Sequence, residues 1–167
     1  ATVHLYYGRL SEVAAASERG YHHAERAQDT QEQGKHRLGR MAADHWGTTP
    51  FDRTEDLLEE DLAWARRTGS LGVEAKAMVR LGVVRALRGD RAGGNELFAR
   101  GMSTCSDIGA RIWAYQELGC WIWALTDDPG VAEARLRETY DVLDEAGRRG
   151  VLSTVAAAYF VPDTVRK

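Results

Sequence analysis

Histidine, the side chain that most often ligates metals and moves protons near neutral pH, is concentrated in the first third of the chain. His22 and His23 are adjacent, and His36 and His45 follow. No His-Glu-x-x-His pattern occurs and no Glu is followed three positions later by His, so no zinc-protease or di-iron site is encoded locally. Adjacent residues on a helix point about 100° apart, so His22 and His23 cannot hold one ion together. We therefore expect surface histidines and neither a metal nor another cofactor.

Hydroxyl and thiol groups gather in the stretch MSTCSDIG, which contains Ser103, Cys105 and Ser106. No glycine elbow surrounds these nucleophiles, and no histidine lies close in the sequence to act as a base. Cys105 and Cys120 are expected to be small buried hydrophobic residues rather than reactive thiols. The carboxylates of residues 55–61 are typical of the solvated face of an amphipathic helix. We expect no enzyme, and an all-helical enzyme without a recognisable motif is the last alternative.

The stretch RALRGDRAGG, residues 85–94, raises the question of a phosphate-binding loop. It lacks the Lys and the Ser or Thr of a P-loop, and no strand pattern precedes it. A turn between two helices accounts for it better, with Gly89 ending one helix and Asp90 capping the next. Gly94 and Gly101 then share one helical face. Because glycine inside a helix costs about 1 kcal/mol relative to alanine, we expect this face to pack closely on a neighbouring helix.

Composition and charge narrow the class of protein. The 167 residues are 44% hydrophobic and 28% charged, which is ordinary for a globular domain. A net charge of −3 with interspersed signs offers no basic surface to nucleic acid. Apolar runs such as VLSTVAAAYFV are too short to cross a bilayer, and the N-terminus has no signal-peptide pattern. Because the chain has only two cysteines, we expect a cytoplasmic protein. From its charge and its short apolar runs we expect it to bind neither nucleic acid directly nor membranes.

Helical periodicity dominates the sequence, and it is interrupted at a regular interval. The interruptions stand at Asp29, Gly69, Gly109 and Gly147. Their spacing is 40, 40 and 38 positions, which predicts two helices per period. The predicted helices cover residues 11–28, 30–46, 50–68, 71–88, 91–108, 110–126 and 129–148, with a helix stub at 1–7 and a further helix beginning near 151.

A helix pair of this length cannot bury its apolar face alone, so neighbouring pairs must stack. We expect a single domain over residues 1–167. Its predicted repeat units are residues 1–29, 30–69, 70–109 and 110–149, followed by a partial helix at 151–167. Because the chain begins with Ala and inside an expected helix, we also expect it to be a segment of a longer protein.

The run MVRLGVVRALRGDRAGGNELFARG resembles a tetratricopeptide repeat in its Leu-Gly pair, its turn and a small, aromatic, small series. The matching residues are, in this order, Leu81-Gly82, Gly89-Asp90, and Gly94, Phe98 and Gly101. The resemblance implies an all-α fold of antiparallel helix hairpins. These hairpins would stack as a right-handed α-solenoid, a tetratricopeptide-like superhelix of about eight to nine helices.

The stretch AEARLRETYDVLDEAGRRGVLSTVAA, residues 132–157, is similar to segments of degenerate tetratricopeptide-like arrays in large bacterial regulators. Those regulators carry an ATPase or nucleotide-cyclase module and often a helix-turn-helix. The resemblance implies a non-catalytic protein-interaction or regulatory module of a signalling or transcription regulator. Its partner would be a protein, a peptide or neighbouring domains of the parent chain, and a homodimer is left open. A sensor that binds a peptide or small ligand in the concave groove is the first alternative.

In tetratricopeptide arrays the first helix of each hairpin lines the concave surface, and the resemblance carries that role to three helices here. The predicted groove contacts are His36, Arg40, Lys76, Val79, Val83, Trp113, Gln116 and Trp123. Val79 and Val83 replace the Lys and Asn of the family's carboxylate clamp, which argues against recognition of a free peptide C-terminus. Such a groove, basic at one end and aromatic at the other, suits an amphipathic helix or an extended peptide. Coverage by a neighbouring domain or a second copy is an equal alternative.

Overall fold

The computed structural model describes residues 8–47 and 49–147 of the chain. Seven helices and no strand occur in this part, as the predicted all-α class requires. The helices are α2 (Leu10–Arg26), α3 (Thr30–Trp46), α4 (Phe51–Thr68), α5 (Leu71–Leu87), α6 (Arg91–Asp107), α7 (Arg111–Leu125) and α8 (Pro129–Glu145). The helices predicted at residues 1–7 and from 151 onward lie outside the described residues.

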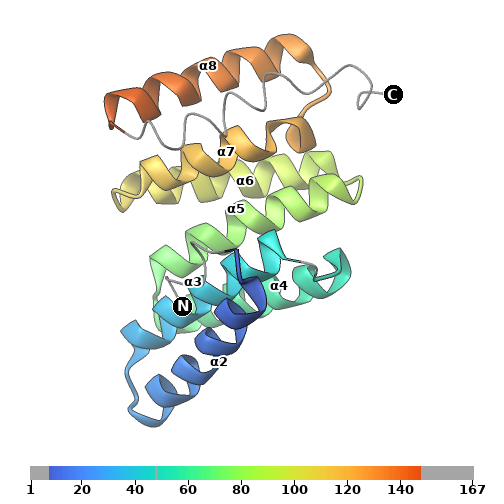
Figure 1. Ribbon diagram of the computed structural model, residues 1–167. Coiled ribbons are helices and arrows are strands. Elements are labelled where there is room, and N and C mark those ends of the chain that lie inside the picture. Colours follow the sequence, from blue (N-terminus) through green and yellow to red (C-terminus); the bar gives the residue numbers. More distant parts are fainter. Residues whose placement is uncertain (1–7, 48, 148–167) are drawn as a thin grey trace.

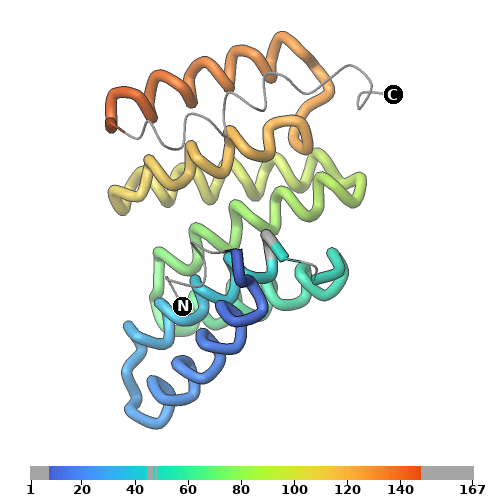
Figure 2. The backbone as a smooth tube through the Cα atoms, in the orientation of Figure 1, coloured from blue at the N-terminus to red at the C-terminus, as the bar shows by residue number. Residues whose placement is uncertain are grey.

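The helices are stacked in chain order, with α2 at one end of the molecule and α8 at the other (Figure 1). The connecting turns alternate between the two sides of the stack, so consecutive helices run in opposite directions (Figure 2). Besides the contacts between consecutive helices, α3 packs on α5 and α5 packs on α7. This packing of neighbouring helices is consistent with a helical repeat. None of the described helices combines the length and the apolar character needed to span a membrane.

The helix ends follow the predicted interruptions closely. Gly69, Gly109 and Gly147 have φ angles of 69°, 74° and 67°, in the left-handed region that glycine enters without steric cost. At the first interruption Gln28 adopts φ 55°, although it carries a side chain. Asp29 then caps α3, because its side chain accepts a hydrogen bond of 2.9 Å from a backbone amide in the first turn. The interruptions that recur about every forty residues are therefore left-handed helix ends.

The glycine-rich stretch is the turn between α5 and α6, as predicted. Gly89 has φ 102°, and the Asp90 carboxylate accepts a hydrogen bond of 2.9 Å from the Gly93 amide. Asp90 is thus the N-cap of α6. In this stretch, which resembled a phosphate-binding loop, Gly89 ends α5 and Asp90 begins α6.

Glycines also set the distance between α5 and α6. A Cβ atom added to Gly94 would lie 2.5 Å from the carbonyl oxygen of Gly82, and one added to Gly82 would meet the same group of Gly94. A Cβ atom on Gly101 would lie 2.8 Å from the backbone nitrogen of Val79. The predicted close packing of the glycine face is confirmed, and it fixes α5 in the middle of the stack.

Helix α5 joins two apolar clusters. One cluster links α5 to α6, α7 and α8 through residues such as Val79, Phe98 and Leu136, and the other links α5 to α3 and α4 through residues such as Met41 and Leu81. A helix that is apolar on nearly every face must be surrounded, and α5 accordingly buries eleven of its residues. Its position decides which side chains of α3 and α7 reach the surface beside it.

Candidate functional site

The predicted groove contacts on α5 need a correction. Val79 and Val83 are each 0% exposed and pack in the cluster that joins α5 to α6, α7 and α8. The physical reason is the glycine contact between α5 and α6, which brings Val79 directly against Gly101. These two side chains offer no surface to a ligand, and the resemblance used in the prediction did not distinguish the α6 side of α5 from its open side.

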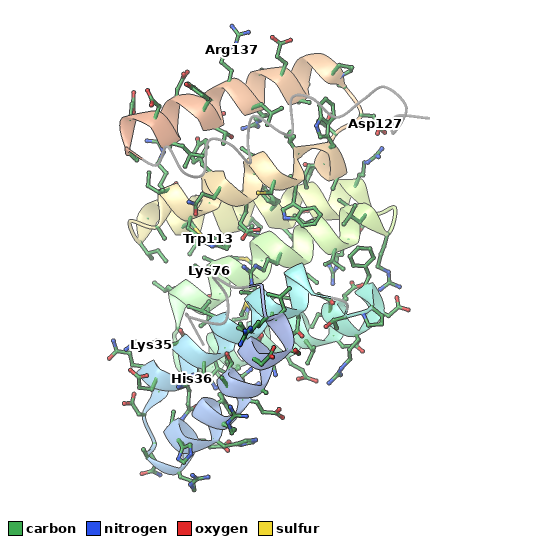
Figure 3. All side chains as sticks on the ribbon, in the orientation of Figure 1. Lys35, His36, Lys76, Trp113, Asp127 and Arg137 are labelled. Atoms are coloured by element: carbon green, nitrogen blue, oxygen red, sulfur yellow. The ribbon has the colours of Figure 1, made fainter. Side chains whose placement is uncertain are left out.

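Lys76 and Trp113 form the best-defined pair among the predicted contacts. The Nζ atom of Lys76 lies 4.6 Å from the centroid of the Trp113 ring, a cation–π contact between α5 and α7. Both side chains are half-buried, and Figure 3 shows them next to each other. Burial lowers the pKa of Lys76, and the positive charge of Arg80 lowers it further. Arg80 also approaches the indole, with its Cζ atom 5.7 Å from the ring centroid.

A buried ion pair lies beneath this contact. The Nη2 atom of Arg80 is 3.3 Å from Oε1 of Glu117, and both side chains are buried. The pair joins α5 to α7 across 37 positions of sequence. Sequence reasoning missed it, because nothing in a helical pattern says which polar residue of one helix faces which residue of another. Breaking such a pair leaves an uncompensated buried charge, so it fixes the relative position of the two helices that carry Lys76 and Trp113.

Gln116 and Trp123 lie further along α7 and are both half-buried. Trp123 packs against the cluster that includes α7 and α8. They share a helix with Trp113, and as residues 113, 116 and 123 they follow one helical stripe. The structure leaves part of each side chain at the surface, so their assignment as ligand contacts stays a prediction.

His36 and Arg40 belong to a different place. The His36 ring lies against Gly20 of α2, where an added Cβ atom would be 2.1 Å from the ring. The Nη2 atom of Arg40 donates to Oδ1 of Asp61 in α4, at 2.8 Å. Their described contacts with other helices are thus with α2 and α4, whereas Lys76 and Trp113 contact each other. In Figure 3 His36 lies well away from that pair.

Arg37, which the sequence analysis did not single out, organises this region. Its guanidinium lies between the rings of Tyr21 and Trp64, with Cζ 4.7 Å from each centroid, and it also hydrogen-bonds Asp61. Burial raises the pKa of the Asp61 carboxyl, while Arg40 and Arg37 act in the opposite direction. Together with Ser17, Arg37 and its neighbours line a cavity of about 160 Å³ between α2 and α3.

The nucleophiles considered in the sequence differ in their exposure and in their contacts. Cys105 is 0% exposed, and burial raises the pKa of its thiol to about 11. The Ser106 hydroxyl donates to the Met102 carbonyl at 3.1 Å, within its own helix. Ser103 is exposed at the edge of a cavity of about 470 Å³ between α6, α7 and α8. The second thiol, Cys120, is half-buried, and burial likewise raises its pKa to about 11.

The residue types that commonly ligate metals do not gather in the described part of the chain. His22 and His23 are exposed, as predicted, and no three His, Cys, Asp or Glu residues gather there as metal ligands would. No family model, curated protein or solved structure matches the chain. Function must therefore be inferred from the two places described above, the α5–α7 face with Lys76 and Trp113 and the cavity between α2 and α3.

Proposed function

We propose that the chain is part of a tetratricopeptide-like α-solenoid that serves as a non-catalytic protein-interaction module of a multidomain regulator. The order of the helices, their alternating direction and the contacts from α3 to α5 and from α5 to α7 support the solenoid. Stacked helix pairs present an extended surface rather than an enclosed active site, which favours recognition of another polypeptide.

The observation that carries the proposal is the pair of Lys76 and Trp113 on the α5–α7 face. Tryptophan is enriched where interfaces concentrate their binding energy, and here the indole is half-buried and held by the cations of Lys76 and Arg80. The ammonium group of Lys76 is repelled by the charge of Arg80 and attracted by that of Glu117, which is itself paired with Arg80. A peptide that combines an apolar anchor with an acidic residue would contact the indole and pair with the ammonium group.

The test is to pan a displayed library of random peptides against the chain and to measure the affinity of the enriched sequences. We expect enriched peptides with acidic and apolar residues. Removal of an interface tryptophan typically costs at least about 2 kcal/mol, so Trp113→Ala should weaken their binding roughly thirtyfold. Tyr140→Ala on α8, where the ring is 45% exposed, is the matched control and should leave binding unchanged.

Two results would contradict the assignment. If a folded Trp113→Ala variant binds the enriched peptides as tightly as the unchanged chain, the α5–α7 face is not the contact surface. If the library yields no sequence that depends on either Lys76 or Trp113, peptide recognition by this face is refuted. Circular dichroism of each variant shows that the helices are retained.

A further inference from the structure

The amine of Lys76 lies in an environment that separates it from an ordinary surface lysine. The side chain is half-buried, and its Nζ atom lies 4.6 Å from the centroid of the Trp113 ring. The Arg80 guanidinium approaches the same ring, so two cations share one indole. Burial in apolar surroundings and a neighbouring positive charge both disfavour the ammonium form, and proteins activate nucleophilic lysines by these same two means.

The charged and titratable groups that act on this amine come from α5, α6 and α7. Burial lowers the pKa of Lys76, and the positive charge of Arg80 lowers it further, whereas Cys105 and Glu117 act in the opposite direction. Burial raises the pKa of the Cys105 thiol to about 11, so the thiol is uncharged near neutral pH. Glu117 is already paired with Arg80 at 3.3 Å. On balance the pKa of Lys76 is lowered, which enlarges the fraction of free amine near neutral pH.

Lys35 on α3 has the opposite environment and serves as an internal reference. Its side chain is exposed, and its Nζ atom forms an ion pair with Glu32, three positions earlier on the same helix. The hydrogen bond to Glu32 and the charge of that carboxylate raise the pKa of Lys35. Lysine occurs once more at position 167, outside the described residues. The described part of the chain thus holds one lysine with a lowered pKa and one with a raised pKa, on different helices (Figure 3).

We propose that Lys76 is a site of acylation by small activated acyl donors of the acyl phosphate class. Its free amine attacks the acyl carbon, the bond from that carbon to the phosphate oxygen breaks, and phosphate leaves with the electron pair. The nitrogen then loses a proton to solvent. The product is a neutral amide, which removes one of the two positive charges beside the Trp113 ring and leaves that of Arg80. A compact donor suits an amine that is only partly exposed beside an indole.

The experiment measures how fast acetyl phosphate acetylates each lysine of the folded chain near neutral pH. The reaction is stopped at low conversion, the chain is denatured, and the remaining amines are acetylated with deuterated acetic anhydride. Trypsin then cleaves at arginine only, and mass spectrometry gives the reacted fraction at each position. The nucleophilicity of a thiol falls only about half as steeply as its pKa, and the same trend in amines leaves the gain in free amine dominant. We expect Lys76 to react at least about threefold faster than Lys35.

Two controls use the same chain. In guanidinium chloride the two lysines should react at equal rates, because unfolding removes both environments. In the folded chain the ratio of the Lys76 rate to the Lys35 rate should fall as the pH is raised, since Lys35 gains free amine at higher pH than Lys76 does. Steric access to each amine cancels from this pH dependence. None of these measurements requires the α5–α7 face to bind a peptide.

Arg80→Gln tests the cause of the preference. It removes the neighbouring cation and leaves Glu117 to pair with Lys76, so the preference for Lys76 should be lost. Arg137→Gln on the exposed face of α8 is the matched control and should change nothing (Figure 3). The proposal is overturned if Lys76 reacts no faster than Lys35, if the preference persists in guanidinium chloride, or if folded Arg80→Gln retains it. If Arg80→Gln does not fold, the pH dependence decides: a falling ratio supports the site, and a constant ratio refutes it.

Discussion

The glycine contact between α5 and α6 gives the sharpest test of the packing, through Gly94→Ala. The added methyl group would lie 2.5 Å from the carbonyl oxygen of Gly82 and 2.9 Å from the backbone nitrogen of Ala86. Both atoms belong to the backbone of the facing helix, so one of the two helices has to move. Overpacking of this kind costs about 1–3 kcal/mol, and the higher helix propensity of alanine returns about 1 kcal/mol. We expect a net loss of up to about 2 kcal/mol in the free energy of unfolding.

Gly72→Ala on α5 is the matched control. No atom outside its own helix turn lies within 4 Å of the Cβ position, so only the helix propensity changes. This variant should gain roughly 0.5–1 kcal/mol. The two substitutions are chemically identical and are expected to have opposite signs, which removes any general effect of replacing glycine by alanine.

The assay is urea unfolding followed by circular dichroism, with thermal unfolding as a second measurement. In a chain of this size 1 kcal/mol corresponds to a change of about 2–4 °C in the melting temperature. If Gly94→Ala stabilises the chain as much as Gly72→Ala does, α5 and α6 are not in backbone contact at this point. The account of α5 as the fixed centre of the stack would then be wrong.

Two further predictions concern backbone strain and buried thiols. Gln28→Gly should raise the free energy of unfolding by up to about 1 kcal/mol in the same urea assay, because Gln28 holds φ 55°, while Gly69→Ala should lower it. Burial raises the thiol pKa of Cys105 and Cys120 from 9.0 to about 11, so the folded state keeps protons that the unfolded state has lost. The contribution of the protonated thiols to the free energy of unfolding should be fully present below pH 9. It should be lost between pH 9 and 11, by on the order of 2 kcal/mol for Cys105. Urea unfolding at several pH values should give a shallower fall for Cys105→Ala, and an equal fall would exclude this cause.

The sequence predicted the helices well, because each helix end is a local event. Gly69, Gly109 and Gly147 mark left-handed ends that need no knowledge of the rest of the fold. The packing role of Gly94 and Gly101 was also predictable, since glycine within a helix needs a compensating contact. The residues near each helix end are therefore enough to place the helices along the sequence.

The candidate site was predictable only in part, because it depends on the rotation of one helix against another. The resemblance to tetratricopeptide repeats placed Val79 and Val83 on the concave surface, but their helix is covered on nearly every face and both are buried. Lys76 and Trp113, which the same assignment placed on two different helices, do contact each other, and their role in ligand binding stays a prediction. The cavity between α2 and α3 has no sequence signal, because its walls form only after the two helices have packed.

The main contacts of the described helices join helices that are one or two places apart along the chain. The side-chain hydrogen bonds found there follow the same pattern, with Arg80 and Glu117 the widest described pair at 37 positions. A chain whose contacts are this local closes only short loops as it folds, so rapid folding is expected. It also means that each end can open without the middle. In native-state hydrogen exchange, amides of α2 and α8 should exchange through partial opening, while those of α5 should exchange only when the whole stack comes apart.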